Sequence, residues 1–148
     1  MTPLELGEKL AKREVEPPPI AKLIGMEIES VERGRAVTTL HAGPRHANPM
    51  GTLHGGILAD LADAAMGMAY ASTLADGEAF TTLELKINFL RPVWDARLTA
   101  TGTVKQGGRT VGLVECDVID EDGRLIAHAS STCMTLRGEK AAGRSLER

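Results

Sequence analysis

The sequence predicts an α+β fold in which an antiparallel β-sheet wraps around one long central α-helix. From Ile57 to Ala69, apolar and small residues recur at near-helical spacing, which indicates a helix that is buried on most of its circumference. Strand-like segments around it are joined by short turns, which is typical of antiparallel pairing. A single apolar helix and a single sheet bury their apolar faces against each other.

The first 24 residues are expected to form a helical arm outside the main domain. Thr2 caps a short helix that has Pro3 at its first position and runs to about Glu14. Three consecutive prolines at 17–19 end this helix as a stiff connector, and a further turn covers residues 20–23. We expect the arm to pack on the edge of the domain or on a neighbouring subunit, without chemistry of its own.

Residues 25–137 form the predicted main domain, with the chain order β-β-α-β-β-β-β. The helix follows a turn-like segment at 46–56 and is expected to end near 74–77. Residues 138–148 form a charged tail that we expect to be frayed. The expected strands are residues 26–31, 35–40, 82–89, 96–104, 110–119 and 125–136.

The strand predicted at 82–89 alternates clearly with a period of two. Its odd-numbered positions, from Leu83 to Phe89, are apolar, whereas its even-numbered positions, from Thr82 to Asn88, are polar. The strand is therefore expected to be half-buried, with Thr82 on the polar face.

Length and composition exclude several classes of protein. The 148 residues fit one domain, and the net charge of −3 argues against broad binding to nucleic acids or anionic membranes. No apolar run approaches transmembrane length, and no signal-peptide layout is recognisable. Cys116 and Cys133 lack metal-type spacing, and two cysteines make no disulfide framework, so the expected compartment is the cytoplasm.

Carboxylates within the apolar helix give the strongest functional hint. Asp60 and Asp63 are its main polar interruptions. A charge in such surroundings is costly unless a partner neutralises it or the protein uses it.

The helix and the turn before it carry a motif of a known family. Asn48, Gly51, the run His54-Gly55-Gly56 and the acidic Asp63, eight positions after Gly55, occur in this order. With the strand order around it, the pattern resembles the hotdog-fold acyl-CoA thioesterases of the phenylacetic acid degradation type. The resemblance covers roughly residues 20–137. It implies hydrolysis of acyl-CoA to the free acid and CoA, by a homodimer or a homotetramer built from two dimers.

The resemblance also implies roles for five residues. Asp63 would be the catalytic carboxylate, as nucleophile or as general base on water. The backbone N–H of Gly55, assisted by His54, would polarise the thioester carbonyl. Asn48 would position the carbonyl or the attacking water, and Thr82, by a looser alignment, would lie near the catalytic carboxylate. The active site would lie between two subunits, with Asp63 of one chain facing Gly55 of the other.

The chemistry of thioester hydrolysis is consistent with these assignments. Negative charge develops on the carbonyl oxygen, and a helix N-terminus supplies N–H groups and partial positive charge. A carboxylate such as Asp63 can act as base or nucleophile. Asp63 lies too far along the helix to reach its own Gly55 easily, which independently favours a site assembled from two chains.

Each of these residues also has a purely structural interpretation. Asp60 is expected to be an exposed or interface residue, and His54 can serve as a helix-entry residue. Asn48 before a proline suits a turn, the glycines suit close packing, and Thr82 suits a strand. The remaining histidines, expected at the surface or in turns, are His41, His46 and His128.

Binding of CoA requires basic residues beside an apolar slot. Arg91, Lys105 and Arg109, together with Arg137, lie near predicted strand ends or turns and are candidates for its phosphates. No metal-binding or serine-hydrolase motif is present, so we expect neither a metal nor a cofactor beyond the CoA of the substrate.

Two other functions remain open from the sequence. One is a hotdog hydratase or dehydratase acting on hydroxyacyl or enoyl thioesters, and the other is a non-catalytic acyl-CoA-binding protein. The sequence does not indicate which acyl group is preferred, nor does it separate the nucleophilic from the general-base mechanism.

Overall fold

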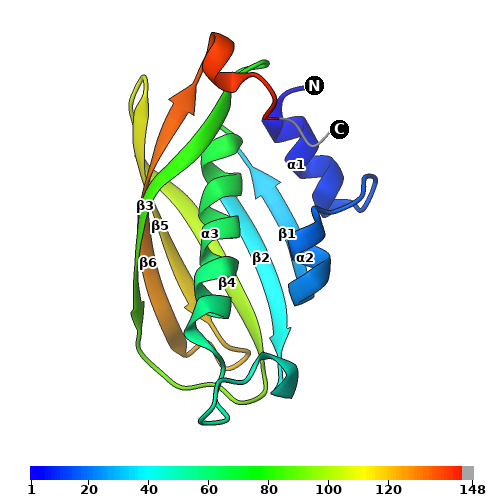
Figure 1. The fold of residues 1–148 in the computed structure, drawn as a ribbon, viewed down its shortest axis with the longest axis vertical. Helices are drawn as coiled ribbons and strands as arrows, with labels where there is room; N and C mark the ends of the chain where they lie inside the picture. Colours follow the sequence, from blue (N-terminus) through cyan, green and yellow to red (C-terminus); the bar gives the residue numbers. More distant parts are fainter. Residues whose placement is uncertain (145–148) are drawn as a thin grey trace.

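A six-stranded antiparallel sheet surrounds one long helix in the computed structural model, which describes residues 1–144 (Figure 1). The helix, α3 (Gly55–Ala71), contacts all six strands. The order across the sheet is β1-β2-β4-β5-β6-β3, which leaves β1 and β3 at the edges. The strands are β1 (Met26–Glu32), β2 (Arg35–Ala42), β3 (Ala79–Phe89), β4 (Ala96–Gly107), β5 (Val111–Ile119) and β6 (Leu125–Leu136). The predicted fold class and the predicted chain order are therefore confirmed.

Small residues allow α3 to lie very close to the sheet. Ala62, Ala65 and Ala69 of the helix are completely buried. On the facing strand, a Cβ atom added to Gly102 of β4 would lie only 2.5 Å from the carbonyl oxygen of Ala65. The helix thus meets the sheet backbone to backbone at this point, while aliphatic side chains such as Leu61, Met66 and Ile126 fill the rest of the core.

We predict that Gly102→Ala destabilises the protein by about 1–3 kcal/mol, because the new methyl group would overlap rigid backbone. Gly107→Ala in the same strand is the matched control, since its added Cβ would meet its nearest neighbour at an ordinary 3.9 Å. The measurement is urea unfolding of the two variants and the wild type. Equal stability of the two variants would contradict the close contact.

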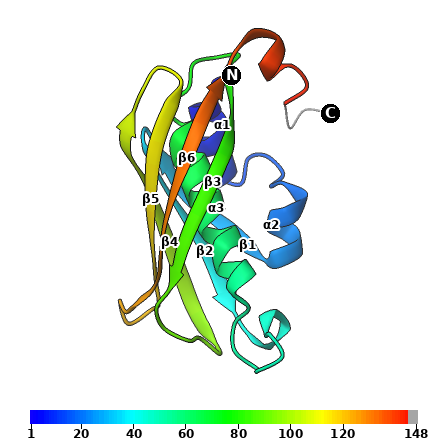
Figure 2. The ribbon, with the colours of Figure 1, turned by 60° about the vertical axis from the view of Figure 1, so that its left-hand side comes forward.

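The N-terminal arm packs on β1 of its own domain (Figure 2). Helix α1 (Pro3–Ala11) begins with a capping box in which Thr2 and Glu5 exchange hydrogen bonds, as the predicted cap requires. It ends three residues before the predicted boundary. The second short helix, α2 (Pro19–Ile24), follows the prolines.

Strand β3 contains a β-bulge that the sequence pattern does not reveal. Thr82 pairs with Cys133 and Glu84 with Thr132, so Leu83 is an extra residue between two ladder positions. Because paired residues share a face, Thr82 points to the same helix-facing side as buried Cys133. The prediction that strict alternation places Thr82 on the outer polar face was therefore wrong.

Three smaller expectations also differ from the structure. Helix α3 ends at Ala71 rather than near 74–77, and Ser72 is its C-cap. His46 lies in a 3₁₀ turn (Pro44–His46), one of the two places expected for it, but it is buried, and its ring hydrogen-bonds the backbone at Ile24 and Gly43. In the predicted frayed tail, Gly138–Ala141 forms a 3₁₀ helix, whereas 145–148 lie outside the described residues. Within residues 1–144, no helix is both long and apolar enough to cross a membrane.

Candidate active site

Four of the five predicted catalytic residues line two cavities beside α3, whereas His54 lines neither. The first, called here the Asp63 cavity, has a volume of about 240 Å³ and contains Asp63 and Thr82. The second, the Gly55 cavity, has a volume of about 440 Å³ and contains Asn48 and Gly55.

The Asp63 cavity has a mostly apolar lining, and Asp63 lies at its mouth with its side chain still exposed to solvent in the single protomer. Asp63 is on α3 and Thr82 enters from β3 because of the bulge at Leu83. The other lining residues, from the arm, β1, α3 and β3, are Pro18, Ile20, Ala21, Met26, Ile28, Ala64, Gly67, Met68, Ala71 and Phe80. Such a cavity can receive an apolar group beside the Asp63 carboxylate.

The surroundings of Asp63 favour its protonated form. Loss of water around the side chain raises the pKa of its carboxyl group, and the charge of Asp60, one turn earlier, raises it further. Burial raises the pKa of Asp60 as well, while the charge of His54 acts in the opposite direction. A carboxylate with a raised pKa is a better proton acceptor, which suits a general base.

The Gly55 cavity lies at the N-terminus of α3. His54 is the N-cap residue, and its side chain makes no capping hydrogen bond to the helix. The Ile57 N–H donates to the His54 carbonyl at 3.0 Å. The N–H groups that open an α-helix, here those of Gly55 and Gly56, have no acceptor within the helix and carry the positive end of its dipole. The ring of Phe89 packs on Gly55 so closely that an added Cβ would lie 2.9 Å from its Cζ atom. A side chain at position 55 would therefore displace the exposed Phe89 ring.

Asn48 holds the loop before the helix in shape. Its side-chain nitrogen donates a hydrogen bond to Thr52 Oγ1 at 2.9 Å, and its oxygen accepts one from the Met50 N–H at 2.9 Å. These bonds give Asn48 a structural role and fix its position in the Gly55 cavity. The ring of His54 lies over Gly56, where an added Cβ would be 3.0 Å from the ring.

One protomer does not bring Asp63 and Gly55 together. They are eight residues apart on the same helix, which corresponds to about 12 Å along its axis. They also line different cavities, at opposite ends of β3: the Asp63 cavity contains Phe80 and Thr82, and the Gly55 cavity contains Phe89.

Of the basic residues predicted to bind CoA, Arg91 lines the Gly55 cavity. Lys105 and Arg109 line neither cavity. Lys105 lies 3.8 Å from the carboxylate of Glu115, and the carbonyl of Arg109 accepts a hydrogen bond from Arg137. Among the described residues, no three His, Cys, Asp or Glu side chains form a group that could hold a metal ion.

Sequence reasoning did not single out the two phenylalanines. They are the only Phe residues of the chain, and each packs on a glycine of α3: Phe80 on Gly67 and Phe89 on Gly55. The signal in the sequence was a bulky side chain near each end of one strand, together with Gly55 and Gly67 near the two ends of the helix.

Comparison with known proteins identifies the family. Residues 50–127, which include α3 and most of the sheet, match the Thioesterase superfamily. The chain belongs to the thioesterase superfamily. The family residues thus include Gly55, Asp63 and Thr82 and end within β6.

Two curated relatives and one solved structure illustrate the similarity. The chain is 30% identical over 121 residues to a 1,4-dihydroxy-2-naphthoyl-CoA hydrolase of Listeria monocytogenes, covering 82% of this chain and 98% of that protein. It is 28% identical over 131 residues to the medium/long-chain acyl-CoA thioesterase YigI of Salmonella typhimurium, and the match covers 78% of this chain and 84% of that protein. The structure of Escherichia coli PaaI, from the phenylacetic acid degradation operon, matches with a TM-score of 0.81 and 28% identity over 93% of this chain and 98% of that one. The hotdog fold and the relation to thioester hydrolases, both expected from the resemblance, are confirmed.

We predict that Asp63→Asn raises the thermal stability of this superfamily member at pH 7. Its folded-state pKa is raised, so the folded protein binds the proton more tightly than the unfolded chain. The ionised carboxylate therefore costs stability once the pH rises through the folded-state pKa. The difference between variant and wild type should shrink as the pH falls toward about 3.9, the ordinary value of an unfolded Asp.

Thermal unfolding followed by circular dichroism across this pH range is the measurement. A variant that is less stable than the wild type at pH 7 would show that the Asp63 carboxylate has stabilising partners instead.

Proposed function

We propose that the protein hydrolyses acyl-CoA thioesters, with Asp63 as the catalytic carboxylate and the Gly55 backbone N–H as the oxyanion donor. The observation that carries this proposal is Asp63 itself, a carboxylate with a raised pKa that faces a small apolar cavity. Membership of the thioesterase superfamily supports the reaction class. The two curated relatives are named for the hydrolysis of CoA thioesters with different acyl groups.

We further propose that the site forms between two subunits through β3. This strand is an edge of the sheet, and its Leu83 side chain is 53% exposed. Antiparallel pairing of two β3 strands about a twofold axis would bring the start of one beside the end of the other. The Asp63 cavity lies at the start of β3 and the Gly55 cavity at its end. Asp63 would then approach Gly55 of the partner subunit.

In this arrangement each cavity would supply different catalytic groups. The N–H groups at the α3 N-terminus would bind the thioester oxygen as negative charge develops on it. Asp63 would either remove a proton from the attacking water or attack the carbonyl carbon itself. The C–S bond then breaks, and CoA leaves as the thiolate or, after protonation, as the thiol. In the nucleophilic case the acyl group remains on Asp63 as a mixed anhydride, and attack by water releases the free acid and restores the carboxylate. Thr82, in the same cavity, would orient Asp63 or the water.

The remaining assignments follow from the same geometry. Arg91, beside Gly55, is the proposed contact for a CoA phosphate. The reaction needs no metal and no cofactor other than the CoA of the substrate. Cys116 and Cys133 are unpaired and buried, which is consistent with the proposed cytoplasmic location.

We expect Asp63→Asn to reduce kcat by about 10²–10⁴-fold, because an amide neither accepts a proton at neutral pH nor attacks a carbonyl. The measurement is release of free thiol from a panel of acyl-CoA esters. Asp60→Asn is the matched control on the same helix and should retain activity within about tenfold, since it changes only the charge near Asp63.

The outcomes of this assay separate the three functions. Thiol release that persists in Asp63→Asn would support thioester hydrolysis but contradict the assignment of Asp63 as the catalytic carboxylate. Loss of enoyl absorbance without free thiol would indicate a hydratase. Tight binding of acyl-CoA without turnover, unchanged in the variant, would indicate a binding protein.

A second prediction tests the shared site by subunit mixing. Asp63→Asn and Gly55→Val should each be inactive alone, the latter because a side chain at position 55 has no room beside Phe89. A mixed dimer contains one site with both residues intact. Random mixing should therefore restore about one quarter of wild-type activity.

Mixing after mild denaturation and refolding, followed by the thiol assay and light scattering, is the measurement. Asn48→Ala can replace Gly55→Val if the latter fails to fold. A fully active monomer, or inactive mixtures of two folded variants that do form hybrids, would place the site within one chain.

A further inference from the structure

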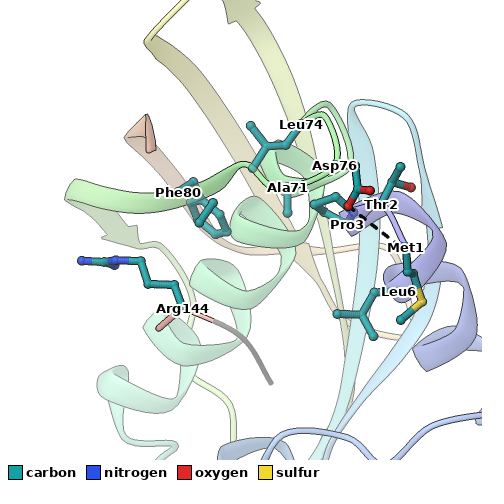
Figure 3. A pocket seen from close by; sticks show the side chains of 10 residues that line it. Met1, Thr2, Pro3, Leu6, Ala71, Leu74, Asp76, Phe80 and Arg144 are labelled. Carbon is teal, nitrogen blue, oxygen red and sulfur yellow. Dashed lines mark ion pairs between the residues drawn. The ribbon is translucent and has the colours of Figure 1, made fainter. Parts of the chain in front are cut away.

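A third cavity lies next to the Asp63 cavity, under the N-terminal arm. This distal cavity has a volume of about 500 Å³, within the range of about 300–1,000 Å³ common for small-molecule sites. It lies between α1, the C-terminal end of α3 and the start of β3 (Figure 3). Its lining residues are Met1, Thr2, Pro3, Leu6, Ala71, Leu74, Asp76, Ala79, Phe80 and Arg144.

The distal cavity and the Asp63 cavity share a wall. Ala71 and Phe80 line both of them. Ala71 is the last residue of α3, two helical turns beyond Asp63 on the same helix. Figure 3 shows Ala71 between Phe80 on one side of the distal cavity and Leu6 of α1 on the other. The route from the carboxylate along α3 therefore leads past Phe80 to the space under α1.

Phe80 is the larger side chain in this wall and packs on a rigid neighbour. Its ring meets the ring of Tyr70 edge-on, with 5.7 Å between the centroids. Tyr70 is buried, and its hydroxyl group is hydrogen-bonded to Thr135 Oγ1 at 2.7 Å. Gly67 gives the Phe80 ring its space, because a Cβ added there would lie 3.1 Å from the ring. Phe80 itself is only half-buried, so its ring can rotate away from a backbone that stays fixed.

We propose that Phe80 is a chain-length gate, and that the substrate is a straight-chain acyl-CoA whose far methylene groups pass Phe80 into the distal cavity. This inference rests on the proposed function, which places the thioester beside Asp63. It assigns the acyl substrate class and adds two specificity-determining positions, Phe80 at the gate and Leu6 inside the distal cavity.

The chemistry of the distal cavity suits an alkyl chain. Leu6, Leu74 and Ala71 supply apolar contact, whereas the charged groups are the Asp76 carboxylate, the Met1 amine 3.8 Å from it, and Arg144. The Asp63 cavity alone, at about 240 Å³, is smaller than typical small-molecule sites and would accept a short chain or a single ring. A long flexible chain would fill both spaces.

The test is a comparison of kcat/KM for butanoyl-, octanoyl-, dodecanoyl- and phenylacetyl-CoA. Leu6→Trp, which fills the distal cavity, should reduce kcat/KM for dodecanoyl-CoA by about tenfold or more, because each methylene group kept out of an apolar pocket is worth about that factor. Butanoyl-CoA, which does not reach the distal cavity, should be hydrolysed as before. Leu23→Trp is the matched control, since Leu23 lies on α2, is 79% exposed and lines neither cavity.

A second variant tests the gate from the other side. Phe80→Ala opens the wall between the cavities and should raise the ratio of dodecanoyl-CoA to butanoyl-CoA turnover relative to the wild type. Adding Leu6→Trp to Phe80→Ala should reverse this gain, which a merely structural role of Phe80 would not produce.

The two proposals fail in different ways. Thiol release that is confined to phenylacetyl-CoA, or a chain-length profile that Leu6→Trp leaves unchanged, would overturn the gate while the thioesterase function stands. An equal loss on butanoyl- and dodecanoyl-CoA in Leu6→Trp would also overturn it. Absence of thiol release from every ester with the wild-type protein would refute the proposed function, and the gate with it.

Discussion

The contact between helix α3 and the sheet is the constraint on which the rest of the structure depends. Gly102 of β4 lies against the backbone of Ala65, and Gly112 of β5 lies against the ring of Tyr70, each with no room for a Cβ atom. A helix this close to a sheet is buried along most of its surface. Only one stripe of α3 remains open, and it carries the helix N-terminus, Asp60 and Asp63. The position of the candidate site is therefore a consequence of close packing.

The open stripe of α3 explains the raised pKa of Asp63 and also why one protomer does not bring all the candidate residues together. Asp63 stands among apolar residues of the arm, β1 and β3, so its ionised form is disfavoured. The groups able to stabilise an oxyanion lie at the N-terminus of the helix, about 12 Å from the mid-helix Asp63 by the rise per residue. A rigid helix cannot bring these two positions together. Assembly of two chains removes the difficulty without any change in the fold of either.

The two phenylalanines line the cavities on the open side of the helix. Phe89 packs on Gly55 at the helix N-terminus, and Phe80 packs on Gly67, about one turn before the helix ends. Both come from β3, the edge strand, which is also the strand best placed to meet a second subunit. One strand thus borders every cavity in which a candidate residue or a proposed substrate group lies.

The sequence pattern predicted the fold class and the order of the helices and strands correctly. The apolar period of α3, the capping box of Thr2 and the short turns between strands act through local geometry, which a linear pattern records. Helix ends were less predictable, because α3 stops at Ala71 while the apolar residues continue to buried Leu74. The candidate residues were also visible, since Asp63 and Gly55 belong to one short motif.

The tertiary structure alone decided which of these residues share a cavity. A bulge at Leu83 turns Thr82 toward Asp63, although the alternation of apolar residues places it on the opposite face. The physical reason is that a bulge forms where two paired strands bend around a curved core. The sequence of one strand alone does not show where that bend is needed. Contacts between distant segments also bury His46 and place Phe80 in the wall between two cavities. The same kind of contact keeps Lys105 and Arg109 away from both site cavities. Such contacts depend on packing in three dimensions, which periodicity does not encode.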